Sequence, residues 1–164
     1  MTDEPSLLGL DAPPARGAEA YRVLARKYRP QTFDSLIGQD AMVRTLANAF
    51  ASRRIAHAFM LTGVRGVGKT TTARIVARAL NCIGADGKRT EPTIQPCGVC
   101  GPCVAISESR HPDVFEMDAA SRTGIDDIRE IIDGTRYLPA EARTKVYIID
   151  EVHMLSKNAF NGLL

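Results

Sequence analysis

The sequence predicts an α/β fold in which a parallel sheet is flanked by helices on both faces. Short apolar runs typical of buried strands occur at residues 57–63, 114–119 and 145–151. Segments with apolar residues at helical spacing follow the first run and separate the second from the third. Strands that alternate with helices in this way form parallel sheets. Because 45% of the 164 residues are apolar, we expect the chain to bury the core of one globular domain.

The helical segments can be placed from their apolar spacing. A helix is expected at residues 40–52, where Asp40 suits the positive end of the helix dipole. Its buried face would be formed by Met42, Val43, Leu46, Ala49 and Phe50. Further helices are expected at residues 69–82 and 124–137. The chain then stops inside a last helix, so we expect a domain that is truncated at its C-terminus.

Composition and charge exclude several classes of protein. The net charge of +2 is only mildly basic, so a nucleic-acid site has to be argued from local positions. No apolar run approaches the roughly 18 residues of a membrane helix, and the N-terminus does not resemble a signal peptide. We therefore expect a soluble, cytoplasmic protein with no membrane partner. Residues 1–20 show neither the helical nor the strand spacing of apolar residues. They are expected to form a flexible tail before a domain at 21–164.

The stretch TGVRGVGKTTTAR at residues 62–74 contains the G-x-x-x-x-G-K-[ST] phosphate loop. Glycine allows backbone N–H groups to approach phosphate oxygens closely, and the following helix adds the positive end of its dipole. We expect Lys69 to reach the β- and γ-phosphates of ATP and Thr70 to bind Mg²⁺. The residues expected to contact the nucleotide here are Gly63, Gly66, Val67, Gly68, Lys69, Thr70 and Thr71. A chance match is disfavoured by the expected strand before the loop and helix after it.

The stretch VYIIDEVHM places an acidic pair directly after the third apolar run. In a phosphate-loop fold, Asp150 takes the Walker B position that helps to hold Mg²⁺. Glu151 would then orient a water molecule for attack on the γ-phosphate, so Lys69, Asp150 and Glu151 are the candidate catalytic residues. A solvated strand end is the plain alternative. A small-molecule kinase is disfavoured because no substrate lid is evident, and the helicase-like letters DEVH are weak evidence by themselves.

All the cysteines fall within a short insert at residues 82–109. They are Cys82, Cys97, Cys100 and Cys103. Thiolates at C-x2-C-x2-C spacing, with a fourth from the preceding helix end, can hold a tetrahedral ion whose coordination is complete and therefore structural. An iron–sulfur cluster or free thiols are alternatives, and zinc is favoured because no redox motif accompanies the cluster. His111 is expected to be a surface loop residue.

Taken together, five segments resemble one protein family. They are YRVLARKYRPQTFDSLIGQ, GVRGVGKTTTARI, CGVCGPC, DAASRTGIDDIRE and KVYIIDEVHMLSKNAFNGLL. From residue 21 to the last residue, the chain resembles the N-terminal AAA+ domain of the gamma/tau family of bacterial DNA polymerase III. The resemblance implies a clamp-loader motor that works with other subunits and uses ATP to place the β sliding clamp on primed DNA.

The same resemblance implies further site residues. Those near the base and sugar of the nucleotide would be Ala25, Arg26, Arg29, Pro30 and Ile37. Those near the DNA backbone would be Ser121, Arg122 and Thr123, at the start of a helix. From the sequence alone, the arginines are equally consistent with surface charge, and residues 121–123 with a helix cap.

Two departures from the family bear on function. The gap between Cys82 and Cys97 is longer than usual, and the family's sensor residues, arginine finger, lid and collar lie beyond residue 164. An alternative hypothesis is therefore that this chain binds ATP and zinc without turnover. A zinc-ribbon DNA-binding protein is a third hypothesis. No aspartate constellation for nucleotidyl transfer is evident, so any polymerase activity would belong to the holoenzyme.

Overall fold

The computed structural model describes residues 28–121 and 125–163 of the chain, so the expected tail at 1–20 lies outside the described residues. The elements are η1 (Phe33–Ser35), α2 (Asp40–Ala51), α3 (Lys69–Asn81), α4 (Gly101–Ser107), β1 (Val114–Asp118), α5 (Ile125–Thr135), β2 (Val146–Asp150), η2 (Val152–Met154) and α6 (Lys157–Leu163). Each of the predicted helices is present, and two of the three predicted strands form.

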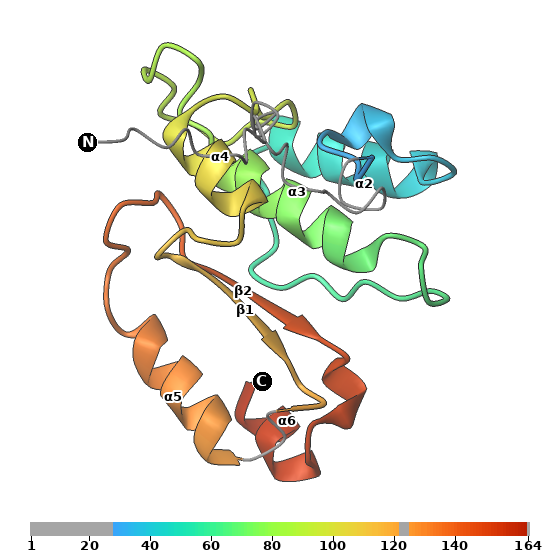
Figure 1. Cartoon of the computed structure of the whole chain (residues 1–164), viewed down its shortest axis with the longest axis vertical. Coiled ribbons are helices and arrows are strands. Elements are labelled where there is room, and N and C mark those ends of the chain that lie inside the picture. Colours follow the sequence, from blue (N-terminus) through green and yellow to red (C-terminus); the bar gives the residue numbers. More distant parts are fainter. Residues whose placement is uncertain (1–27, 122–124, 164) are drawn as a thin grey trace, which may run out of the picture.

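The strands β1 and β2 pair in parallel, in a register that runs from Val114 opposite Val146 to Asp118 opposite Asp150. Helices α2, α3 and α4 lie on one side of this two-stranded sheet, and α5 and α6 lie on the other (Figure 1). The predicted α/β class, with parallel strands between two layers of helices, is therefore confirmed. Because the strands are parallel, their carboxyl ends at Asp118 and Asp150 meet at one edge.

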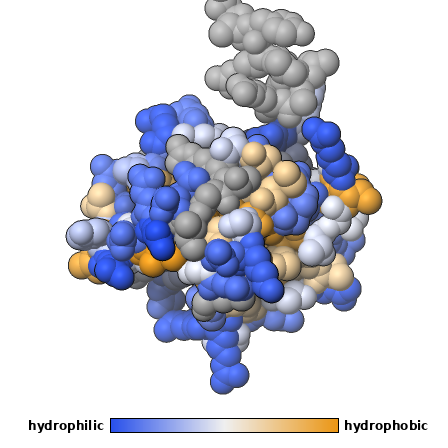
Figure 2. All heavy atoms as spheres, turned by 90° about the horizontal axis from the view of Figure 1, so that it is seen from below, coloured by the Kyte–Doolittle hydropathy of each residue, from blue (hydrophilic) through white to orange (hydrophobic). Residues whose placement is uncertain are grey.

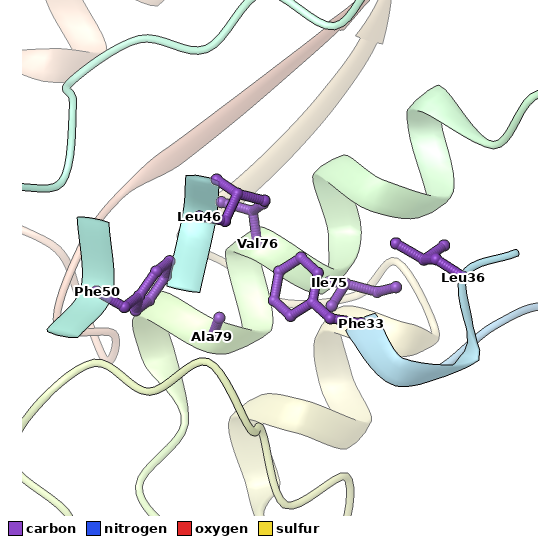
Figure 3. Close-up of a cluster of buried hydrophobic side chains, with 7 residues drawn as sticks. All are labelled: Phe33, Leu36, Leu46, Phe50, Ile75, Val76 and Ala79. Carbon is purple, nitrogen blue, oxygen red and sulfur yellow. The ribbon is translucent and has the colours of Figure 1, made fainter. Parts of the chain in front are cut away.

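One hydrophobic core joins α2 to α3 (Figure 3). It consists of Phe33, Leu36, Leu46, Phe50, Ile75, Val76 and Ala79, all at most 9% exposed. The face predicted for the first helix supplies Leu46 and Phe50, with Met42 and Val43 packed at the edge of the cluster. This core anchors α3, whose first residue is the lysine of the phosphate loop.

A second core lies on the other face of the sheet. Ala119, Ile128, Leu155 and Ala159 are its buried members, and Met117 of β1 and Ile149 of β2 pack against them. Ile128 is fully buried, as its helical spacing with the neighbouring isoleucines predicts. This core holds α5 and α6 against the strands that end in the acidic residues.

The expected strand at residues 57–63 is not formed, which corrects one prediction. Phe59 and Met60 are 42% and 69% exposed, and within the described residues β1 and β2 pair only with each other. A strand requires a neighbouring strand for its backbone hydrogen bonds, and an apolar composition alone does not supply one. The segment therefore runs as an extended connection from α2 to the phosphate loop.

The surface has no continuous apolar face in the view of Figure 2, where apolar residues lie in separate areas among hydrophilic ones. Among the helices of the described residues, none has the length and apolar content that crossing a bilayer would require.

Candidate functional site

A cleft of about 1330 Å³ opens between the phosphate loop and the carboxyl ends of the strands. Its walls come from the segment before η1, from the start of α3, and from β1 and β2. The position at the carboxyl ends of parallel strands is the usual place for ligands in open α/β sheets. The sequence-predicted residues can therefore be examined in one shared space.

The phosphate loop is shaped by its glycines. Gly68 is the residue before α3 and has φ of +100°, and Gly66 has φ of +85°. Residues with a Cβ rarely adopt these values, so the two positions require glycine. The ammonium of Lys69 donates to the carbonyl oxygens of Gly63 at 3.0 Å and Val64 at 3.2 Å. Its positive charge is thereby held inside the loop, beside the N-terminal end of α3.

Thr70 and Asp150 meet across the cleft although they are 80 residues apart in the chain. The Thr70 hydroxyl donates to Oδ2 of Asp150 at 2.9 Å. The other carboxylate oxygen, Oδ1, accepts the backbone N–H of Glu151 at 3.0 Å. A hydroxyl and a carboxylate at this separation are the oxygen ligands that Mg²⁺ prefers at phosphate sites.

Glu151 has an unusual backbone. Its φ of +50° and ψ of +42° place a non-glycine residue in the left-handed region, at a cost of roughly 1–3 kcal/mol. The strain is held by the hydrogen bond to Asp150 and by the N–H of Met154, which donates to the Glu151 carbonyl at 2.8 Å. Its side chain lies 3.4 Å from Nδ1 of His153. Glu151 directly follows the last residue of β2 and lines the cleft.

The predicted nucleotide residues fall into three groups. Those that line the cleft are Arg29, Pro30, Ile37, Gly66, Val67, Gly68, Lys69, Thr70, Thr71, Asp150 and Glu151. Gly63 does not line the cleft, but its carbonyl accepts the ammonium of Lys69, which does. Ala25 and Arg26 lie outside the described residues.

The predicted DNA-facing residues are only partly described. The Ser121 hydroxyl donates to the carbonyl of Asp118 at 2.9 Å, in a turn that follows β1. This turn is also held by the Ala120 N–H, which donates to the Asp118 carboxylate at 2.8 Å. Arg122 and Thr123 lie outside the described residues.

An ion pair inside the cleft was not predicted from the sequence. Arg74 of α3 donates to Glu116 of β1 through Nε at 2.9 Å and Nη2 at 2.7 Å. Both residues line the cleft, and their side chains are only 19% and 30% exposed. The sequence feature that could have placed Arg74 at the cleft is its position four residues after Thr70, on the same face of the helix. Glu116 carried no comparable signal, because strand pairing decides which face it occupies.

The four cysteines converge as the spacing predicts. Their sulfur atoms all lie within 4.8 Å of one another, and Cys82, Cys100 and Cys103 are buried. None of these cysteines forms a disulfide. Tetrahedral zinc–sulfur bonds of about 2.3 Å place sulfur atoms about 3.8 Å apart, so the group fits a single ion and is too compact for a cluster of several irons.

Backbone donors surround the thiols unequally. Burial raises the pKa of Cys82, but hydrogen bonds from the N–H groups of Cys97 and Gly84 outweigh it and lower that pKa to about 7. Burial raises the pKa of Cys103 strongly, and the neighbouring Cys100 and Cys82 raise it further. These opposite pKa shifts favour a thiolate at Cys82, the residue that directly follows α3, over one at Cys103.

His111 is not a surface residue, contrary to the sequence-based expectation. It is 6% exposed, and its Nδ1 accepts the backbone N–H of Asp113 at 3.1 Å. The imidazole therefore orients the chain before β1 and lies apart from the cysteine group, which is complete without it.

Comparison with known proteins places this geometry in a family. The family model described as "DNA polymerase III, delta subunit" matches residues 38–164. The tau subunit of DNA polymerase III from Escherichia coli (strain K12) is 50% identical over 145 residues, covering 88% of this chain and 22% of that subunit. The tau subunit from Bacillus subtilis (strain 168) is 45% identical over 145 residues, covering 88% of this chain and 25% of that subunit.

A gamma subunit shows the same degree of similarity. That of Buchnera aphidicola subsp. Schizaphis graminum is 50% identical over 145 residues, covering 88% of this chain and 38% of the relative. The chain thus spans about a fifth to two fifths of the length of these proteins. The resemblance to gamma/tau subunits is confirmed, and the chain belongs to the family of DNA polymerase III subunits that the matching model describes.

Proposed function

We propose that this chain is the nucleotide-binding part of a clamp-loader ATPase of the AAA+ type, with a structural zinc module inserted after its phosphate-loop helix. The observation that carries the proposal is the hydrogen bond of 2.9 Å between Thr70 and Asp150, beside Lys69. Similarity to tau and gamma subunits supports the same assignment. The substrate is ATP, and Mg²⁺ is the metal that the Thr70 and Asp150 oxygens suit.

Each residue has a defined task in the proposed reaction. Bound Mg²⁺ would neutralise phosphate charge that develops during hydrolysis. The Lys69 ammonium exchanges the carbonyls of Gly63 and Val64 for phosphate oxygens. The Glu151 carboxylate accepts a hydrogen bond from the attacking water and orients it. Arg29, Pro30 and Ile37 cover the base and sugar from the other wall of the cleft.

The zinc module has a structural task. The four thiolates close the coordination of one ion, so no position is left for substrate. Cys82 directly follows α3 and Cys103 belongs to α4, and these two helices pack together. Zinc at this point would join the end of the phosphate-loop helix to the insert.

The wider role follows from the family. The parent protein would act with other clamp-loader subunits to place the β sliding clamp on primed DNA during replication. Ser121, with Arg122 and Thr123 next to it in the chain, is the proposed contact to the DNA backbone.

Two substitutions test the catalytic proposal in the complete subunit. Lys69→Ala should weaken ATP binding, measured with a fluorescent ATP analogue. Glu151→Gln should leave that binding intact and abolish hydrolysis, with Glu130→Gln as a control at an exposed helical site. Undiminished turnover by Glu151→Gln would remove Glu151 from the mechanism.

A second function is favoured by the exposed segment before the phosphate loop. Because Phe59 and Met60 are uncovered, the loop lacks a rigid strand behind it. This chain by itself would then bind ATP and zinc without turnover. Steady ATP hydrolysis by the purified 164-residue chain would contradict this alternative.

A further inference from the structure

One side chain outside the cysteine group donates to a proposed zinc ligand. The guanidinium Nη1 of Arg89 lies 3.6 Å from Sγ of Cys82, within the range of a hydrogen bond to sulfur. The same nitrogen donates to the carbonyl of Gln95 at 3.4 Å. Cys82 is fully buried, whereas Arg89 is exposed, so the guanidinium covers the sulfur from the solvent side.

The backbone of Arg89 is fixed independently of its side chain. Its N–H donates to the carbonyl of Ile83 at 2.8 Å, which closes the loop that follows Cys82. Its carbonyl accepts Nη2 of Arg143 at 2.9 Å, from the segment that leads into β2. Arg143 also donates to the carbonyls of Leu80 and Cys82 at the end of α3. The position of Arg89 is therefore set by groups that a substitution of its side chain would leave in place.

Charge explains why a cation is placed there. Four thiolates around one zinc ion leave an excess of two negative charges. Backbone N–H groups donate to Cys82 from Gly84 and Cys97, and to Cys97 from Cys100, but these donors carry no net charge. Among the hydrogen bonds of the described residues, the one from Arg89 is the only bond to a cysteine sulfur from a charged group.

We infer that Arg89 is a positioning residue of the metal centre, which donates to the Cys82 thiolate and strengthens metal binding without touching the ion. The inference rests on the proposed zinc site and adds to it a determinant that lies in the long gap between Cys82 and Cys97. Partners that hydrogen-bond a metal ligand typically change metal affinity by about 10–100-fold when they are removed.

Zinc affinity measured by competition with a chromogenic chelator tests the inference. Arg89→Met and Arg89→Gln should each weaken zinc binding by about 10–100-fold, while Arg89→Lys, which keeps the charge, should recover most of it. Lys88→Met is the matched control, since Lys88 is the adjacent exposed cation and its side chain makes no hydrogen bond in the described part of the chain. This control should bind zinc as tightly as the unsubstituted protein.

A cobalt spectrum separates a bond to sulfur from a general effect on the loop. When Co²⁺ occupies the thiolate site, loss of the Arg89 donor should shift the sulfur-to-cobalt charge-transfer band to lower energy. A change confined to loop stability would leave the band in place. Unchanged affinity together with an unchanged band in Arg89→Met overturns the inference. Absence of both metals from the unsubstituted protein overturns the metal site itself, which is a distinguishable result.

Discussion

The guanidinium of Arg78 donates to both the side-chain and the backbone oxygens of Gln31, 47 residues earlier in the chain. The bond to Gln31 Oε1 is 2.8 Å long, and Arg78 is 3% exposed. Burial lowers the pKa of Arg78, an effect that negative charge on the nearby Cys103 sulfur opposes. Gln31 directly follows Arg29 and Pro30, so this pair ties one wall of the cleft to the helix that begins at the phosphate loop.

Replacing Gln31 should therefore destabilise the protein. Gln31→Ala leaves a buried guanidinium with one fewer acceptor, which we expect to lower the free energy of unfolding by about 1–3 kcal/mol. Urea denaturation measures the change, and Gln95→Ala serves as the control because the Gln95 hydrogen bonds of the described residues come from its backbone and not from its side chain. Equal midpoints for Gln31→Ala and the unsubstituted protein would show that the backbone oxygen alone satisfies Arg78.

The buried carboxylate of Asp113 should make the free energy of unfolding depend on pH in the acidic range. This carboxylate is 1% exposed and accepts the backbone N–H groups of Ala140, Glu141 and Ala142 at 2.7–2.8 Å. Burial raises the pKa of Asp113, but the three donors and His111 outweigh it, so the pKa is lowered overall. The stabilisation by Asp113 is therefore fully present at pH values above about 3.9, the pKa of aspartate in the unfolded chain. It is lost as the pH falls towards the lower pKa of Asp113 in the folded protein.

Asp113→Asn should lower the free energy of unfolding at pH 7 by about 1–3 kcal/mol, because an amide offers one acceptor oxygen where the carboxylate offers two. The difference from the unsubstituted protein should shrink below about pH 4. Urea titrations at both pH values measure it, with the exposed Asp34→Asn as control. A difference that stays constant across this range would be evidence against the charged acceptor.

The pair formed by Arg74 and Glu116 should be energetically coupled. A double-mutant cycle with Arg74→Met and Glu116→Gln should give a coupling energy of about 1–2 kcal/mol, since the contact is bidentate and largely shielded. The coupling should persist in part in high salt because the two side chains, 19% and 30% exposed, are partly shielded from solvent. Strictly additive single effects would mean that α3 and β1 are held together by packing alone.

Metal removal should loosen the end of the phosphate-loop helix. A zinc chelator should lower the unfolding temperature of the unsubstituted protein and leave Cys103→Ser, which lacks a ligand, nearly unaffected. Circular dichroism at increasing temperature records both. The same response in both proteins would place the chelator's effect elsewhere than at the cysteine group.

Much of the site was predictable because its signals are local. The spacing from Gly63 to Thr70 requires a tight loop before a helix, and the structure begins α3 at Lys69. The run before Asp150 forms a strand that ends at that residue. The cysteine spacing predicted the convergence of sulfur atoms, since C-x2-C turns bring neighbouring thiols together whatever the rest of the fold does.

Only the tertiary structure decided which residues distant in sequence become strand neighbours or hydrogen-bond partners. The apolar run at residues 57–63 has the composition of a strand, yet strand formation depends on a neighbour, and the described residues provide none. Arg74, Arg78 and Asp113 are charged residues that the sequence could not distinguish from surface charge. Their hydrogen-bond acceptors or donors lie 27–47 residues away in the chain, and only the folded chain brings these groups together.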